Sequence, residues 1–286
     1  MGADARLGNP YGLGDRARRS CRSAQPPRCR CTVLKPERSH PMTRFTFSLP
    51  ILALGTALAF PVCAAPLSQS SISDDISQST LPEGGKFSTV SGGVTIGTSD
   101  GTLSVRTVSG DIHVTQSRGP LDVHTVSGTL DVEHAAGAVE VRSASGNVTL
   151  DHTGGAVSIR TMSGESTLDH AGRDIMIRSI SGDMTLMLDA ASQMRTIDIG
   201  TISGDMTIHL PHGFGGTFDI RLKQRRSETT LPLQQSLGLT VRMGNWEKDS
   251  GNSEEVRTIT ATGKVGDGRD HIIVRGVAGS LKLVQD

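Results

Sequence analysis

The sequence has few aromatic residues and few cysteines. Its 286 residues include six Phe, one Trp and one Tyr, and the four cysteines lie at positions 21, 29, 31 and 63. Because no cysteine follows residue 63, the rest of the chain cannot depend on disulfides and must be stabilised by packing and backbone pairing. The shortage of stacking aromatics also argues against binding of single-stranded nucleic acid.

The balance of charge conceals an uneven distribution. Lys/Arg and Asp/Glu number 29 each, but residues 1–41 hold nine basic and three acidic residues, whereas residues 65–286 hold 19 basic and 26 acidic ones. Phosphate binding requires a net positive footprint, which this mildly acidic body lacks. We therefore predict no nucleic-acid partner.

Long apolar runs are absent too. Residues 42–64 begin at Met42 with one positive charge, continue through a short apolar stretch and end on small residues at Ala64. This is the form of a signal peptide, and the stretch is shorter than the roughly 20 apolar residues of a membrane span. We predict cleavage after Ala64, with lipidation at Cys63 as the rival interpretation and no transmembrane span after cleavage.

The segment before the predicted signal needs its own interpretation. Residues 1–41 are interpreted as a disordered leader or as upstream sequence read from a misplaced start codon, and they are excluded from fold reasoning. Export through the signal peptide predicts a periplasmic protein or a secreted, cell-surface one.

One dipeptide recurs at a fixed interval along the body of the chain. Ser-Gly returns every 18 residues and once more after 22, at Ser91, Ser109, Ser127, Ser145, Ser163, Ser181 and finally Ser203. Further glycines lie midway between them, at Gly101, Gly119, Gly137 and Gly155. The half-period is therefore nine residues. Such a period is typical of a solenoid, whose units bury their apolar side chains only by stacking on neighbours.

Apolar and polar residues alternate after each of these glycines, as at Val94 and Ile96. This period of two predicts strands, and no later stretch has the helical period of 3.6. An 18-residue coil has either three six-residue faces or two nine-residue halves. Six-residue faces would need aliphatic residues where Asp100 and Arg106 stand, so we predict two strands per coil with glycine corners. The fold class is an all-β, single-stranded, β-helix-like solenoid.

The repeat also suggests where the chain divides. Residues 65–83 are expected to be a polar linker, residues 84–220 the regular solenoid, and residues 221–286 an irregular loop and a C-terminal β-cap of the same domain. Within the last part, residues 227–255 are polar and are expected to form a long excursion suited to partner binding. Residues 278–283 resemble a last, degenerate coil that closes the end.

Several polar positions recur with the same spacing. A ladder of hydroxyls, expected to make hydrogen bonds at the corners, consists of Thr89, Thr107, Thr125, Ser143, Thr161, Ser179 and Thr201. A basic column, expected to face outward, consists of Arg106, His124, Arg142, Arg160 and Arg178. Asp122 and Glu140, two places earlier, compensate part of its charge. The column is either a binding strip for an anionic partner such as an acidic glycan, or a solvated face that discourages association.

A second series combines histidines with acids. His134, His152 and His170 are 18 residues apart and each follows an acid, at Glu133, Asp151 and Asp169. Stacked imidazoles could share Zn²⁺. However, the histidines have the sequence parity of the inward aliphatics, so they are expected to cap the edge of the core, with metal binding as the alternative.

No residue is assigned a catalytic role, and no cofactor is predicted. The sequence has no Walker loop. An alternative remains: a polysaccharide-active β-helix enzyme that uses carboxylates of the acidic face, such as Asp151 and Asp169. The short loops and rare aromatics argue against it.

Repeated segments carry a resemblance to a known family. The segments TVSGDIHV, SISGDMTL and TISGDMTIHLP, followed by GFGGTFDI and GDGRDHIIVRGVAGSLKL, resemble a bacterial family of adhesin-like β-strand-repeat domains of unknown function. The resemblance covers residues 84–286 and implies a fold but no catalytic residues. The predicted function is an exported, non-enzymatic adhesin-like or envelope scaffold, whose partner is a cell-envelope glycan or protein.

Overall fold

The computed structural model describes residues 65–190, 194–227, 231–248 and 254–285. The predicted leader and the predicted signal peptide, with Cys63, lie outside the described residues, so the predicted cleavage after Ala64 stays a prediction. Every regular element within these ranges is a strand, so the all-β prediction is confirmed. No described segment forms a helix with the length and apolarity needed to cross a membrane.

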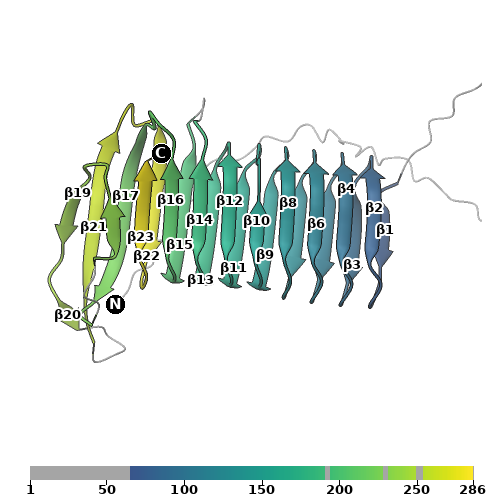
Figure 1. Cartoon of the computed structure of the whole chain (residues 1–286), viewed down its shortest axis with the longest axis horizontal. Helices are drawn as coiled ribbons and strands as arrows, with labels where there is room; N and C mark the ends of the chain where they lie inside the picture. The colour runs from purple at the N-terminus through teal and green to yellow at the C-terminus, as the bar shows by residue number, and fades with distance from the viewer. Residues whose placement is uncertain (1–64, 191–193, 228–230, 249–253, 286) are drawn as a thin grey trace, which may run out of the picture. The chain divides into compact units, whose positions relative to one another are not determined.

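The strands form two largely parallel sheets, one strand of each coil belonging to each sheet (Figure 1). Sheet A contains, in spatial order, β1 (Leu67–Ser70), β3 (Gly85–Thr89), β5 (Leu103–Thr107), β7 (Leu121–Thr125), β9 (Val139–Ser145), β11 (Val157–Ser163), β13 (Ile175–Ser181), β15 (Thr196–Ser203), β22 (Asp270–Gly276), β17 (Gly216–Arg225), β21 (Glu255–Val265) and β19 (Thr240–Met243), with β20 (Glu247–Lys248) beside β21. Sheet B contains β18 (Leu233–Gln235), β23 (Leu281–Gln285), β16 (Met206–Leu210), β14 (Met184–Leu188), β12 (Ser166–Ala171), β10 (Val148–Leu150), β8 (Leu130–Ala135), β6 (Ile112–Ser117), β4 (Val94–Ser99) and β2 (Ile76–Leu81).

The 18-residue period sets the pairing register. In sheet A, Leu121 pairs with Val139, and in sheet B, Leu130 pairs with Val148. Equivalent residues of successive coils therefore stack in columns about 4.8 Å apart. This arrangement confirms the solenoid with two strands per coil and excludes six-residue faces.

The core fills the space between the two sheets. Inward positions carry Val, Ile and Leu that are almost fully buried, and Phe87 and Phe218 are the largest apolar side chains among them. Ser166, which replaces an inward aliphatic residue, is 2% exposed. A coil this thin leaves room for aliphatic side chains, which explains the scarcity of aromatic residues.

The corners after sheet A are held by the predicted hydroxyl ladder. Thr107 Oγ1 accepts a hydrogen bond from the N–H of Gly110 at 3.0 Å, and Thr161 Oγ1 donates to the carbonyl oxygen of Ser163 at 3.0 Å. The serines of the Ser-Gly pairs also bridge coils, since Ser127 Oγ donates to the carbonyl oxygen of Val108 at 3.2 Å. Corner hydrogen bonding is confirmed for the five threonines of the ladder, whereas the hydroxyls of Ser143 and Ser179 are buried without a hydrogen-bond partner among the described residues.

The Ser-Gly-Asp motif serves the stacking of these corners. A Cβ on Gly110 would lie 2.0 Å from the carbonyl oxygen of Gly92, so only glycine fits this close approach. The next residue, Asp111, accepts the N–H of Thr129 in the following coil at 2.8 Å. The motif is thus explained by structure, without a ligand.

The structure differs from three expectations about the ends. Residues 65–83, expected as a linker, instead form β1 and β2, which pair with β3 and β4. Residues 221–286 contain less loop than expected, since β21 is an 11-residue strand paired antiparallel with β17. The last coil does not close the end, because β22 lies between β15 and β17.

Candidate functional site

The five residues of the basic column lie on the outer face of sheet A. Parallel pairing aligns Arg106, His124, Arg142, Arg160 and Arg178 on β5, β7, β9, β11 and β13. Alternation turns them outward because Val105 and its equivalents point into the core. The predicted placement of the column is confirmed.

Acids on the same face neutralise part of the column, as the sequence indicated. His124 Nε2 lies 3.0 Å from Asp122 Oδ1, and Arg142 pairs with Glu140. Arg178 Nη2 lies 2.5 Å from Asp198 Oδ2. By contrast, Arg106 and Arg160 form no ion pair or side-chain hydrogen bond with another residue in the described ranges, so two guanidinium groups are unpaired.

The column is longer than the sequence indicated. Gly200 of β15 interrupts it, but Gly200 pairs with Arg275 of β22, which in turn pairs with Arg221 of β17. Sequence spacing could not reveal these two arginines, because β22 and β17 join the sheet out of chain order.

An exposed aliphatic ladder accompanies the basic column. The residue before each Ser-Gly points outward two places after the basic position, and these residues are Val90, Val108, Val126, Ala144, Met162, Ile180 and Ile202, followed by Val277. Met162 is 56% exposed and Ile202 is 52% exposed. The sequence carries the signal for this ladder as an apolar residue directly before every Ser-Gly, with the same parity as the basic position two places earlier.

Open hollows lie between the basic column and the aliphatic ladder. One of about 420 Å³ is lined by Arg106, His124 and Met162, and another of about 300 Å³ by Arg160, Arg178 and Ile180. A third, of about 510 Å³, lies between Arg275 and Ile202. The outer face of sheet A therefore offers a row of hollows with one cationic and one apolar side.

The histidine series does not cap the core. His134, His152 and His170 are all exposed, and that expectation is wrong. Glu133 and His134 face outward consecutively before Ala135 turns back into the core. This extra outward residue shifts the alternation by one place, as in a β-bulge. β4, β6 and β12 carry the same shift, but β14 does not, and the register between β12 and β14 changes after Leu168.

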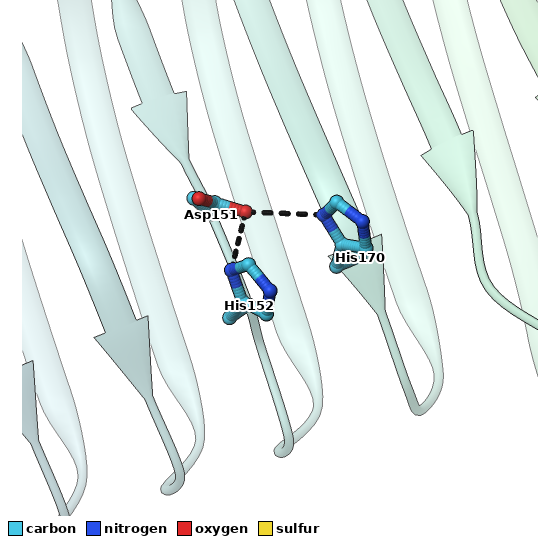
Figure 2. Close-up of side chains that lie close together, drawn as sticks. All are labelled: Asp151, His152 and His170. Atoms are coloured by element: carbon cyan, nitrogen blue, oxygen red, sulfur yellow. Dashed lines mark hydrogen bonds and ion pairs between the residues drawn. The ribbon is translucent and has the colours of Figure 1, made fainter.

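Two of the three histidines converge on one carboxylate, as Figure 2 shows. Asp151 Oδ1 lies 2.7 Å from His152 Nδ1 and 3.2 Å from His170 Nδ1. The rings of His152 and His170 stack with centroids 4.4 Å apart. The ring of His134 lies edge-on to that of His152, with centroids 4.9 Å apart. The cluster is therefore an aspartate with two histidines, whereas the sequence suggested three histidines.

The protonation of Asp151 follows from these contacts. Burial by itself would raise the pKa of its carboxyl group, but hydrogen bonds with His152 and His170 and the charge of His152 outweigh it, and the pKa lies below its ordinary value of 3.8. Asp151 is thus a carboxylate at neutral pH. Asp169, the next acid of the series, also faces outward but does not belong to this cluster.

Comparison with known proteins supports a repeat domain and leaves its chemistry open. No curated protein and no solved structure matches the chain. A family model does match, over residues 101–234, and its description is Toastrack DUF4097, a domain of unknown function.

Proposed function

We propose that this protein is an exported, non-enzymatic β-solenoid of the cell envelope, an adhesin-like scaffold that binds an anionic glycan along the outer face of sheet A. The basic column carries the proposal. Its basic residues are in register from β5 to β13 and continue at Arg275 and Arg221. Arg106 and Arg160 are unpaired within the described residues and are free to meet a carboxylate or sulfate.

A polymer suits this surface better than a small substrate. The column repeats about every 4.8 Å over several coils, so an extended chain could contact several arginines at once. Single exposed ion pairs contribute little, about 0–1 kcal/mol, and affinity would come from many contacts made together. The aliphatic ladder would supply apolar contacts to the same ligand across the hollows.

Binding to acidic polysaccharides, measured on a glycan array and then by titration calorimetry, tests the proposal. The double variant Arg106→Glu/Arg160→Glu is expected to weaken glycan binding by roughly tenfold or more. High salt should weaken glycan binding by the parent protein similarly. The matched control is Arg118→Glu/Lys282→Glu, which makes the same change in net charge at exposed positions away from the column. Equal effects of both variants would contradict a site on sheet A.

Export is tested separately. Cell fractionation should find the protein in the periplasm or at the cell surface, and N-terminal sequencing should begin at Ala65. A protein found only in the cytosol would contradict the envelope role. Turnover of a bound polysaccharide that is lost in Asp151→Ala/Asp169→Ala would instead favour the enzymatic alternative.

A further inference from the structure

A second cluster, independent of the basic column, gathers metal-binding side chains on the sheet B side of the coil. Asp151 and His152 directly follow β10, and His170 belongs to β12 in the next coil. One donor atom from each lies within 4.8 Å of the other two (Figure 2). Because successive coils are stacked in register, this convergence is a consequence of the repeat.

The backbone at both histidines is unusual. His152 has φ of 47° and His170 has φ of 53°, and no other non-glycine residue in the described ranges has a positive φ. A residue with a side chain in this left-handed region is strained by about 1 kcal/mol or more. Residues with such backbone strain cluster at functional sites. A glycine would fit both positions more easily, so the corner keeps imidazoles where its backbone favours glycine.

A neighbouring acid completes the environment of His170. Its Nδ1 faces Asp151, and its Nε2 lies 4.0 Å from Asp189 Oδ1. Histidines that bind a metal through one ring nitrogen commonly direct the other toward a carboxylate, which fixes the tautomer. Asp189 stands in the direction that such a partner would occupy.

We propose that Asp151, His152 and His170 bind a divalent transition-metal ion, with Zn²⁺ as the best match, through one carboxylate oxygen and two imidazole Nδ1 atoms. Imidazole and carboxylate are standard zinc ligands, and Zn²⁺ prefers them in a tetrahedron with bonds of about 2.0–2.2 Å. The fourth position would face solvent, where water or a ligand group of a partner can bind.

The present geometry requires only small movements to hold the ion. Donor atoms of a tetrahedral zinc site lie about 3.3 Å apart, and the two measured oxygen–nitrogen separations are 2.7 Å and 3.2 Å. The histidine side chains are 51% and 47% exposed, so their rings can turn without disturbing the core. Ca²⁺ and Mg²⁺ are expected to bind poorly, because they prefer oxygen ligands alone.

Zinc titration calorimetry on the chelator-treated full chain tests the site, with the cysteines alkylated in every sample so that Cys21, Cys29 and Cys31 do not bind Zn²⁺. The parent should bind one Zn²⁺ more than His152→Gly/His170→Gly. Each of Asp151→Asn, His152→Gly and His170→Gly should weaken that site at least roughly tenfold. Zn²⁺ should also raise the Tm of the parent but not of the double glycine variant.

The matched control is His113→Ala. His113 belongs to a similar histidine–acid pair on the same sheet, with its Nδ1 3.1 Å from Asp131 Oδ2, and its loss should leave zinc affinity unchanged. The glycine variants should fold, because glycine accepts the positive φ. Equal zinc uptake by the parent and the double glycine variant would overturn the proposal. So would a loss in His134→Ala as large as that in His152→Gly, which would show a different ligand set.

Discussion

Arg195 and Asp270, which are 75 residues apart in the sequence, form a buried ion pair: Arg195 Nε lies 2.8 Å from Asp270 Oδ2, and the two side chains are 1% and 4% exposed. The same guanidinium donates to the carbonyl oxygens of Ala171 and Asp189. Asp270 is the first residue of β22, and Arg195 immediately precedes β15. The pair therefore helps to fix the position at which the C-terminal coil joins the stack.

Replacing Asp270 with Ala should destabilise the protein by about 3–5 kcal/mol, because it leaves the buried Arg195 without an opposite charge. Urea unfolding followed by circular dichroism measures this change. The double variant Arg195→Met/Asp270→Leu should recover much of the loss, since it removes both charges. The control is Asp267→Ala, at an exposed pair with Arg269, where about 0–1 kcal/mol is expected. A similar small effect at Asp270 would contradict the role of the buried pair.

Close stacking of the corner glycines gives a second prediction. Gly110→Ala should destabilise the solenoid by about 1–3 kcal/mol, because its Cβ would lie 2.0 Å from a backbone oxygen of the preceding coil. Gly154→Ala is the matched control, since its Cβ would have no atom nearer than 3.6 Å. Thermal unfolding of the two variants measures the difference. Equal melting temperatures would show that the corner can relax.

The regular part of the fold could be predicted because its determinants are local. The 18-residue interval and the alternation of apolar residues define two strands per coil, and the same alternation placed Arg142 and Arg160 on the outer face. Corner hydrogen bonding followed from the threonine that stands two places before most of the Ser-Gly pairs. In each case the residue types within one coil, repeated in the next, determine which way the side chain points.

The remaining features depend on relationships that spacing does not encode. The position of β22 between β15 and β17 is set by contacts between distant segments, such as Arg195 with Asp270, so neither Arg275 nor Arg221 could be assigned to the column. Strict alternation predicts the wrong direction for the histidine side chains, because one extra outward residue at His134 shifts the alternation. The outward direction of Asp151 could therefore be predicted, but its position between the two histidines could not.

Inward and outward residues of one strand should differ sharply in their contribution to stability. Ile159 of β11 is fully buried, whereas Met162 of the same strand belongs to the exposed ladder. Ile159→Ala should cost about 2–5 kcal/mol because it leaves a cavity, while Met162→Ala should change stability by roughly 0.5 kcal/mol or less. Denaturant titration of both variants measures these values. A large effect at Met162 would show that the ladder stabilises the fold instead of remaining available for a ligand.

Acid should weaken the corner at Asp151. Its pKa is lower in the folded protein than its ordinary value of 3.8, so folding favours the carboxylate. This contribution is fully present above the unfolded pKa and is lost as the pH falls through the folded one. The free energy of unfolding of the metal-free parent protein should therefore exceed that of Asp151→Asn by a constant amount near neutral pH. This difference should shrink below pH 3.8. Urea midpoints of both proteins, measured from neutral pH to about pH 2, give this difference. Because the Asp151 side chain is 41% exposed and solvent screens its interactions, the change should be small. A difference that grows with acid would contradict the lowered pKa.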